Sequence, residues 1–208
     1  SAAPTYARAP TAMSSSFVCS SYECETPSAS RGIPREQIHA VGADSGAGPL
    51  VLHWDGEIWE SLDSGLTGAL WWVHAVDDVV FMSGSDAHVV RYQDGQFERM
   101  PTPGLGKHTV FGVWAVSPED VYAVGSVAGR NGFIWHYDGT GWSEVALPED
   151  IPLDENRDTP PFFKAWGSTA NDVCVVGQGG VILKGSAATG FKVLDTPGDK
   201  TLFTVHYA

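Results

Sequence analysis

The sequence predicts an all-β fold in which a unit of four short antiparallel strands recurs along the chain. Three observations support this prediction. The 208 residues include 24 Gly and 13 Pro together with 8 Trp, 6 Tyr and 9 Phe, a composition typical of a turn-rich β protein. One short pattern of apolar strands recurs several times. Asp-Gly turns follow most copies, and these residues tolerate the positive φ of tight hairpins.

The repeat is clearest in two segments. GVWAVSPEDVYAVG at residues 112–125 contains two similar strands joined by a polar turn, and KAWGSTANDVCVVG at residues 164–177 is a looser copy. Each complete copy has an aromatic first strand, a polar turn, a second strand, a Gly-rich connection and a third strand, and most have an Asp-Gly turn before the fourth. The four copies cover residues 38–62, 72–100, 112–147 and 164–194.

Four short strands cannot bury both faces of their sheet unless neighbouring sheets pack on each other. The radial solution is a β-propeller built from four-stranded antiparallel blades. We therefore predict a β-propeller in which the recurring aromatic residues pack between blades.

The first and last copies are incomplete in complementary ways. PREQIHAVG enters the pattern at the second strand, whereas TLFTVHYA at residues 201–208 matches only a first strand, with His206 in the place of Trp114. We expect four blades with overlap closure, in which the C-terminal strand is innermost in the blade that the N-terminal part begins. The alternative is a fragment or half of a larger propeller, whose ring a second chain completes.

The N-terminal residues differ in composition from the repeats. Residues 1–33 are rich in Ser, Ala, Pro and Thr and are expected to form a tail or spacer before the propeller at 34–208. Cys19 and Cys24 in this tail are candidates for a small-loop disulfide, whereas Cys174 lies in an apolar strand and is expected to be a small buried hydrophobe. The cysteine spacing matches no zinc or haem site.

Charge and hydropathy exclude some partners. The formal net charge of −13 repels phosphate backbones, so no nucleic-acid partner is expected. The longest apolar runs are strand-sized, so no membrane insertion is expected. The chain begins at Ser1 without Met, which fits a processed protein that is secreted, periplasmic or on the cell surface.

Two quoted segments carry a resemblance to known proteins. AWGSTANDVCVVGQGGVILK and VWAVSPEDVYAVG with FIWHYDGTGWSEV resemble the WGS-x-NDVWAVG and YDGTxW repeats of secreted myxobacterial-type β-propeller proteins. The resemblance covers about residues 34–208 and implies the fold, but it implies no activity, because propellers include lectins, scaffolds and enzymes. The Asp-Gly turns are also partly similar to the Asp-box hairpins of sialidase-like propellers. His53 and His136 replace the Ser or Thr of that motif, and no sialidase activity follows.

The expected ligand-binding surface is the face of the disc on which the copies differ. It carries the loops between second and third strands and the crossovers between blades, whereas the turns on the other face are alike in most copies. Variable loops on a rigid scaffold are the usual place for binding. The candidate ligand-binding residues on this variable face are Asp44, Asp86, Lys107, His108, Arg130 and Asn131.

Two groups of residues are candidate metal ligands, although no cofactor is certain. The crossover at 148–161 is acidic and could ligate calcium, but its spacing fits no EF-hand and favours a solvated acidic loop. His74 and His206 share one repeat position with Trp114 and Trp166, so they could bind a transition metal in the central channel or serve as packing residues. The acidic candidates are Asp150, Asp154, Glu155 and Asp158.

The expected function is a non-catalytic recognition module that binds a glycan, a protein or a small ligand through the variable face. The sequence contains no G-x-S-x-G elbow, no H-E-x-x-H motif and no phosphate-binding glycine loop. One alternative is an enzyme or metal-dependent protein that uses the central channel. Another is an architectural subunit of an extracellular assembly.

Overall fold

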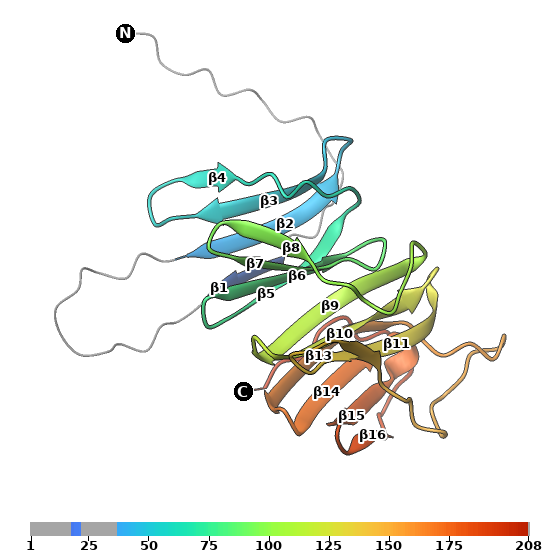
Figure 1. The fold of residues 1–208 in the computed structure, drawn as a ribbon. Coiled ribbons are helices and arrows are strands. Elements are labelled where there is room, and N and C mark those ends of the chain that lie inside the picture. The colour runs from blue at the N-terminus through green and yellow to red at the C-terminus, as the bar shows by residue number, and fades with distance from the viewer. Residues whose placement is uncertain (1–17, 22–36, 208) are drawn as a thin grey trace, which may run out of the picture.

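The computed structural model describes residues 18–21 and 37–207. The strands form four antiparallel sheets of four strands each, and in every sheet the strands are neighbours in chain order. The chain is thus a β-propeller of four-stranded blades, as the sequence predicts. In Figure 1 the sheets stack one after another, from the blue first blade to the red fourth blade. The described residues contain no helix long and apolar enough to cross a membrane.

The strand boundaries follow the four repeats. The first blade contains β1 (Val18–Ser21), β2 (Ile38–Asp44), β3 (Pro49–Trp54) and β4 (Trp59–Ser61). The second contains β5 (Leu70–Val76), β6 (Val79–Gly84), β7 (Val89–Gln93) and β8 (Gln96–Arg99). The third contains β9 (His108–Ser117), β10 (Asp120–Val127), β11 (Arg130–Tyr137) and β12 (Trp142–Glu144). The fourth contains β13 (Phe162–Thr169), β14 (Asp172–Gly177), the 3-10 turn η1 (Gln178–Gly180), β15 (Ile182–Ser186) and β16 (Gly190–Val193).

Apolar side chains fill the spaces between consecutive blades, as expected for a propeller. Strand β10 shows the principle, because its side chains alternate between two cores. Val121 and Ala123 pack with the second blade, whereas Tyr122 and Val124 pack with the fourth. A third core joins the first and second blades around Val41, Val73 and Met82. The sequence similarity between VWAV and VYAVG therefore arises because they form two adjacent strands that are both buried on two faces.

A β-bulge recurs at the same place in three of the innermost strands. The pairing register shifts between Leu70 and Trp72 in β5, between Val110 and Gly112 in β9, and between Phe162 and Lys164 in β13. In each strand one residue is therefore extra: Trp71, Phe111 and Phe163. A bulge redirects the side chain of its extra residue and increases the local twist.

A glycine near the end of the second strand in three blades accommodates the backbone next to the bulge. A Cβ atom built on Gly84 would lie 2.2 Å from the Ala69 carbonyl oxygen, and one on Gly125 would lie 1.9 Å from the Thr109 carbonyl oxygen. Gly177 has the same relation to Pro161, at 2.3 Å. These distances are too short for any side chain. The final Gly of the repeated VG element is therefore required by close backbone approach.

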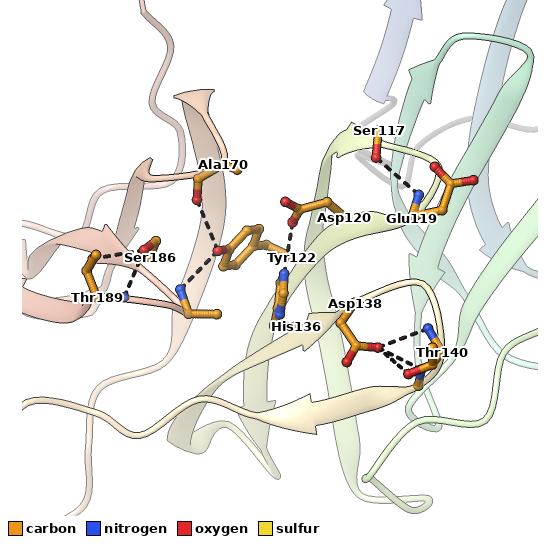
Figure 2. A network of polar contacts seen from close by, with 12 residues as sticks. Ser117, Glu119, Asp120, Tyr122, His136, Asp138, Thr140, Ala170, Ser186 and Thr189 are labelled. Atoms are coloured by element: carbon orange, nitrogen blue, oxygen red, sulfur yellow. Dashed lines mark hydrogen bonds and ion pairs between the residues drawn. The ribbon is translucent and has the colours of Figure 1, made fainter.

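Polar contacts join the third and fourth blades at Tyr122 (Figure 2). Its hydroxyl donates to the Ala170 carbonyl at 3.3 Å and accepts from the Ala187 amide at 3.0 Å. Nearby, His136 Nε2 lies 2.8 Å from the Asp120 carboxylate and ties two strands of one blade together. The polar tip of this buried tyrosine is thus satisfied by the neighbouring blade.

The Asp-Gly turns are stabilised by the aspartate itself, as Figure 2 shows for Asp138. Its Oδ1 accepts hydrogen bonds from the Thr140 amide at 2.9 Å, the Thr140 hydroxyl at 2.7 Å and the Gly141 amide at 3.0 Å. These bonds, led by the one from the Thr140 side chain, lower the pKa of Asp138 to about 2. The repeated Asp is therefore a turn residue.

The innermost position of the first blade differs from the sequence expectation. We expected the C-terminal strand there, but β1 pairs antiparallel with β2 in that position. Strand β1 lies within the predicted tail at residues 1–33 and contains Cys19, whereas Cys24 lies outside the described residues. Residues 201–207 form no strand and lie against the fourth blade, where Phe203 contacts Phe163 of the innermost strand β13. The first-strand pattern was recognisable at residues 201–208 only, because the β1 segment lacks its aromatic residues.

Replacing Gly125 with alanine should destabilise the protein by about 1–3 kcal/mol, as expected for a side chain forced into a filled space. The added Cβ would meet the Thr109 carbonyl oxygen at 1.9 Å, and a backbone atom cannot rotate away. Urea unfolding followed by circular dichroism measures the change. Gly141→Ala is the matched control, because no atom lies within 4 Å of its Cβ position. Equal stability of the two variants would contradict the close-approach explanation.

Candidate functional site

The three bulges place aromatic side chains on one surface of the innermost strands. The ring centroids of Trp71 and Phe111 are 6.0 Å apart, and those of Phe111 and Phe163 are 5.2 Å apart. Phe203 extends the series, with its centroid 5.2 Å from that of Phe163. We call these four residues the aromatic row. It crosses three consecutive blades and the segment that follows the fourth.

The aromatic row is accessible to a ligand at both ends. Trp71 is 45% exposed and Phe203 is 68% exposed, whereas Phe111 and Phe163 are half-buried between them. Each row residue on a blade lies near the start of an innermost strand, directly after a crossover between blades. The aromatic row therefore borders the variable face. Exposed aromatic rings in contact with one another are typical of a binding surface rather than of a solvated strand.

The sequence analysis missed the aromatic row, although a signal was present. Trp71, Phe111, Phe163 and Phe203 share the second column of the aligned first strands, LWWVHAV, VFGVWAV, FFKAWGS and LFTVHYA. We expected all recurring aromatic residues to pack between blades. The second-column residues on the three blades do not pack between blades, because the bulge takes their side chains out of the regular alternation of the strand.

The third column of the same strands holds Trp72, Gly112, Lys164 and Thr204. Lys164 is only 2% exposed. Its Nζ lies 3.3 Å from the centroid of the Trp72 ring and 5.0 Å from that of Trp166. Burial lowers the pKa of Lys164 to about 7. This ammonium group thus lies between indole rings of the second and fourth blades.

Gly112 lets Lys164 reach from one blade to another. It occupies the third column in the blade between them, and a Cβ atom there would lie 2.7 Å from the Phe163 carbonyl oxygen. Strands β9 and β13 therefore approach closely, and no side chain from the third blade separates Lys164 from Trp72. The three blades contribute the aromatic surface and the amine together.

The two predicted channel histidines have different environments. His74 is buried, and its Nε2 donates to the Ala115 carbonyl oxygen at 3.2 Å. His206 is exposed, with its ring centroid 4.4 Å from that of Trp166. Trp166 contacts the His74 ring as well, at 5.8 Å, whereas Trp114 is buried in the core of the third and fourth blades. Both histidines therefore pack on Trp166.

The acidic crossover is organised by its own backbone. Asp154 Oδ1 accepts hydrogen bonds from the amides of Asn156 at 2.8 Å and Asp158 at 2.9 Å. The Asp158 carboxylate lies 3.5 Å from the Arg130 guanidinium, which links two of the predicted sites. Asp150 and Glu155 are exposed. Residues 18–21 and 37–207 contain no group of three or more His, Cys, Asp or Glu residues arranged to hold a metal ion.

Several predicted ligand-binding residues take part in loop structure. The Asp44 carboxylate accepts hydrogen bonds from the amides of Gly46, Gly48 and Gly68, at 2.6, 3.1 and 2.8 Å respectively. These bonds lower the pKa of Asp44, and the bond from Gly46 has the largest effect. His108 Nδ1 contacts the Leu105 carbonyl oxygen at 2.8 Å, and the ring lies against Trp135.

The other three ligand-binding candidates present their side chains to solvent. Asp86 lies in a variable loop and Asn131 at the start of strand β11, and both have positive φ. Lys107 lies in the crossover before β9. These exposed side chains and the aromatic row belong to the same face of the disc.

Cys174 is a free, buried cysteine. Burial raises the pKa of its thiol. A buried thiol with a raised pKa is a poor nucleophile, in keeping with the predicted role as a small hydrophobe.

Comparisons with known proteins show no family for this chain. No protein-family model matches the chain, and no curated protein matches it. Among solved structures the chain is similar to one described as YCF48 bound to D1 peptide, with 16% sequence identity and a TM-score of 0.42. The match covers 76% of this chain and 63% of that one, so the chain spans less than two thirds of that structure's length.

Acidification should destabilise the protein through its buried histidines. Burial lowers the pKa values of His39 and His74 to about 4, with a smaller contribution from His53 for His39. Unfolded histidine has a pKa of about 6.5, so the unfolded state binds more protons between pH 6.5 and 4. Stability is then full above pH 6.5 and falls by roughly 2 kcal/mol per histidine at pH 5.

Urea unfolding at pH 7.5 and pH 5 measures this loss. His74→Gln should reduce the difference between the two pH values. Thr204→Gln, at an exposed position without a titratable group, is the control and should leave the difference unchanged. An unaltered difference in His74→Gln would contradict the assignment.

Proposed function

We propose that the chain is a secreted, non-catalytic recognition module whose ligand contacts the aromatic row beside the variable face. The observation that carries the proposal is the continuous contact of Trp71, Phe111, Phe163 and Phe203 on one partly exposed surface. Three of these residues are the extra residues of equivalent bulges. The same backbone feature thus presents an aromatic ring in three consecutive blades.

The chemistry of the aromatic row favours binding over catalysis. Aromatic rings offer large, rigid contact areas that lose little conformational entropy on binding, but they transfer no protons. They suit the flat apolar face of a sugar ring, an apolar side chain of a protein, or an aromatic small molecule. The buried His74 already donates to a backbone carbonyl. We therefore favour recognition over an enzyme that uses the channel.

We also propose that a further β-element, from this polypeptide or a second chain, packs beside residues 201–207. These residues repeat the first-strand pattern, and the Leu202 amide donates to the Gly177 carbonyl at 3.0 Å. Phe203 and His206 contact the fourth blade through Phe163 and Trp166, as an innermost strand of a following blade would. Native mass spectrometry of the purified chain should detect an oligomer if that element comes from a second copy.

Removing a row residue should weaken ligand binding about tenfold or more, as expected for a central aromatic contact. The variants are Trp71→Ala and Phe163→Ala, and the measurements are binding to a glycan array and to an apolar peptide array. Trp59→Ala is the matched control, because Trp59 is 48% exposed but lies on the outer strand β4. A ligand whose binding is weakened by Trp59→Ala and not by Trp71→Ala would contradict the proposal.

A further inference from the structure

We propose that Lys164 and Trp72 form a binding site for a single carboxylate group directly next to the aromatic row. The inference rests on the proposed recognition function for the apolar part of the ligand and adds an acidic group to it. Two hydrogen-bond donors without partners among the described residues carry the proposal: the Lys164 ammonium, and the Trp72 indole nitrogen, which is fully buried.

The first donor is the ammonium group of Lys164. It is 2% exposed, and it makes no hydrogen bond or ion pair within the described part of the chain. The Trp72 and Trp166 rings compensate part of its charge through cation–π contacts. A buried cation nevertheless remains costly until an anion pairs with it. The absence of an acidic neighbour agrees with the cause of its lowered pKa, which is burial alone.

The second donor is the indole nitrogen of Trp72. Its Nε1 is buried and has no hydrogen-bond partner in the described residues. An indole N–H only donates, and so does an ammonium group. The Nε1 atom belongs to the ring whose centroid lies 3.3 Å from the Lys164 Nζ. The two donor atoms are therefore close together. A group that satisfies them must accept hydrogen bonds and carry negative charge, which a carboxylate does.

The surrounding residues limit the ligand further. His74, the other titratable group beside Lys164, has its Nε2 engaged by the Ala115 carbonyl and offers no acceptor for the ammonium. The site offers one cation in a chain whose net charge is −13, so a polyanion would be repelled over a long range. A monoanion fits this balance better than a phosphate or sulfate polymer.

The aromatic row supplies the contact for the rest of the ligand. Trp71 immediately precedes Trp72, and Phe163 immediately precedes Lys164, so each donor is adjacent in the chain to a row residue. A molecule with a carboxylate attached to a flat apolar group can reach both layers. The ligand class is therefore an aryl or alkyl monocarboxylate, free or as part of a larger partner.

Isothermal titration of the full 208-residue chain with phenylacetate and with phenylacetamide tests the site. The two probes share their ring and differ in charge. Phenylacetate should bind in the millimolar range expected for so small a ligand, and phenylacetamide at least about tenfold more weakly. Equal binding of the two probes, or no binding of phenylacetate, would overturn the inference.

Variants identify the groups responsible. Lys164→Met keeps most of the length of the side chain and should remove the preference for phenylacetate. Lys184→Met on the third strand β15, where Lys184 pairs with Asp172 at 2.9 Å, should keep it. Trp72→Phe keeps an aromatic ring beside Lys164 but removes the second donor, and it should weaken phenylacetate severalfold more than the amide. This variant tests the site if Lys164→Met fails to fold. Retention of the preference in both variants would refute the site.

The two proposals fail in distinguishable ways. Trp71→Ala should weaken both probes to a similar degree, because it removes contact with their shared ring. If it weakens neither, the aromatic row is not the recognition surface. If it weakens both while neither Lys164→Met nor Trp72→Phe changes the preference, only the carboxylate site is wrong. Coupling the same carboxyl group to a peptide distinguishes a free acid from a protein partner.

Discussion

The arrangement of three of the four blades depends on one backbone contact, the approach of a carbonyl oxygen at or just before the start of the innermost strand to a glycine in the last part of the second strand. The contact recurs in three blades at Gly84, Gly125 and Gly177 and accompanies a bulge each time. The bulge keeps the first two strands paired while one residue is left out of register. Most of each first strand can then be buried between blades, while its second-column residue remains at the surface. A single local feature therefore serves both the interblade packing and the aromatic row.

Much of the fold could be predicted because it depends on local patterns. The strand units follow from alternating apolar residues, and the hairpin turns follow from Asp-Gly pairs whose carboxylates accept nearby amides, as Asp138 does. The double burial of β10 explains why its residues 121–124 are apolar without interruption. The position of the first blade's innermost strand was not predictable in this way. Four residues of β1 hold that place through backbone pairing, which leaves little trace in the side chains.

The candidate site was harder to predict, because it depends on register rather than on composition. Trp71 and Trp72 are neighbours of the same type, yet the bulge exposes one, while the indole nitrogen of the other is buried. The aligned columns contained both groups, but alternation alone assigns them to opposite faces without saying which face is open. Asp44 and Asp154 show the converse. Their acidic character suggested ligand binding, whereas their carboxylates stabilise their own loops through backbone amides.

Lys164 connects the fold to its proposed use. The third column holds Trp72 in the second blade, Gly112 in the third and Lys164 in the fourth. Because Gly112 has no side chain, Lys164 and Trp72 are in contact. An apolar residue of similar length at position 164 would fill the same space without burying a charge, and such replacements of buried ions are often neutral or stabilising. The stability of the fold therefore gives no reason for an unpaired ammonium at this place. Among the described residues this ammonium has no partner, and we infer that a bound carboxylate supplies one, with the indole nitrogen of Trp72 as a second donor to the same group.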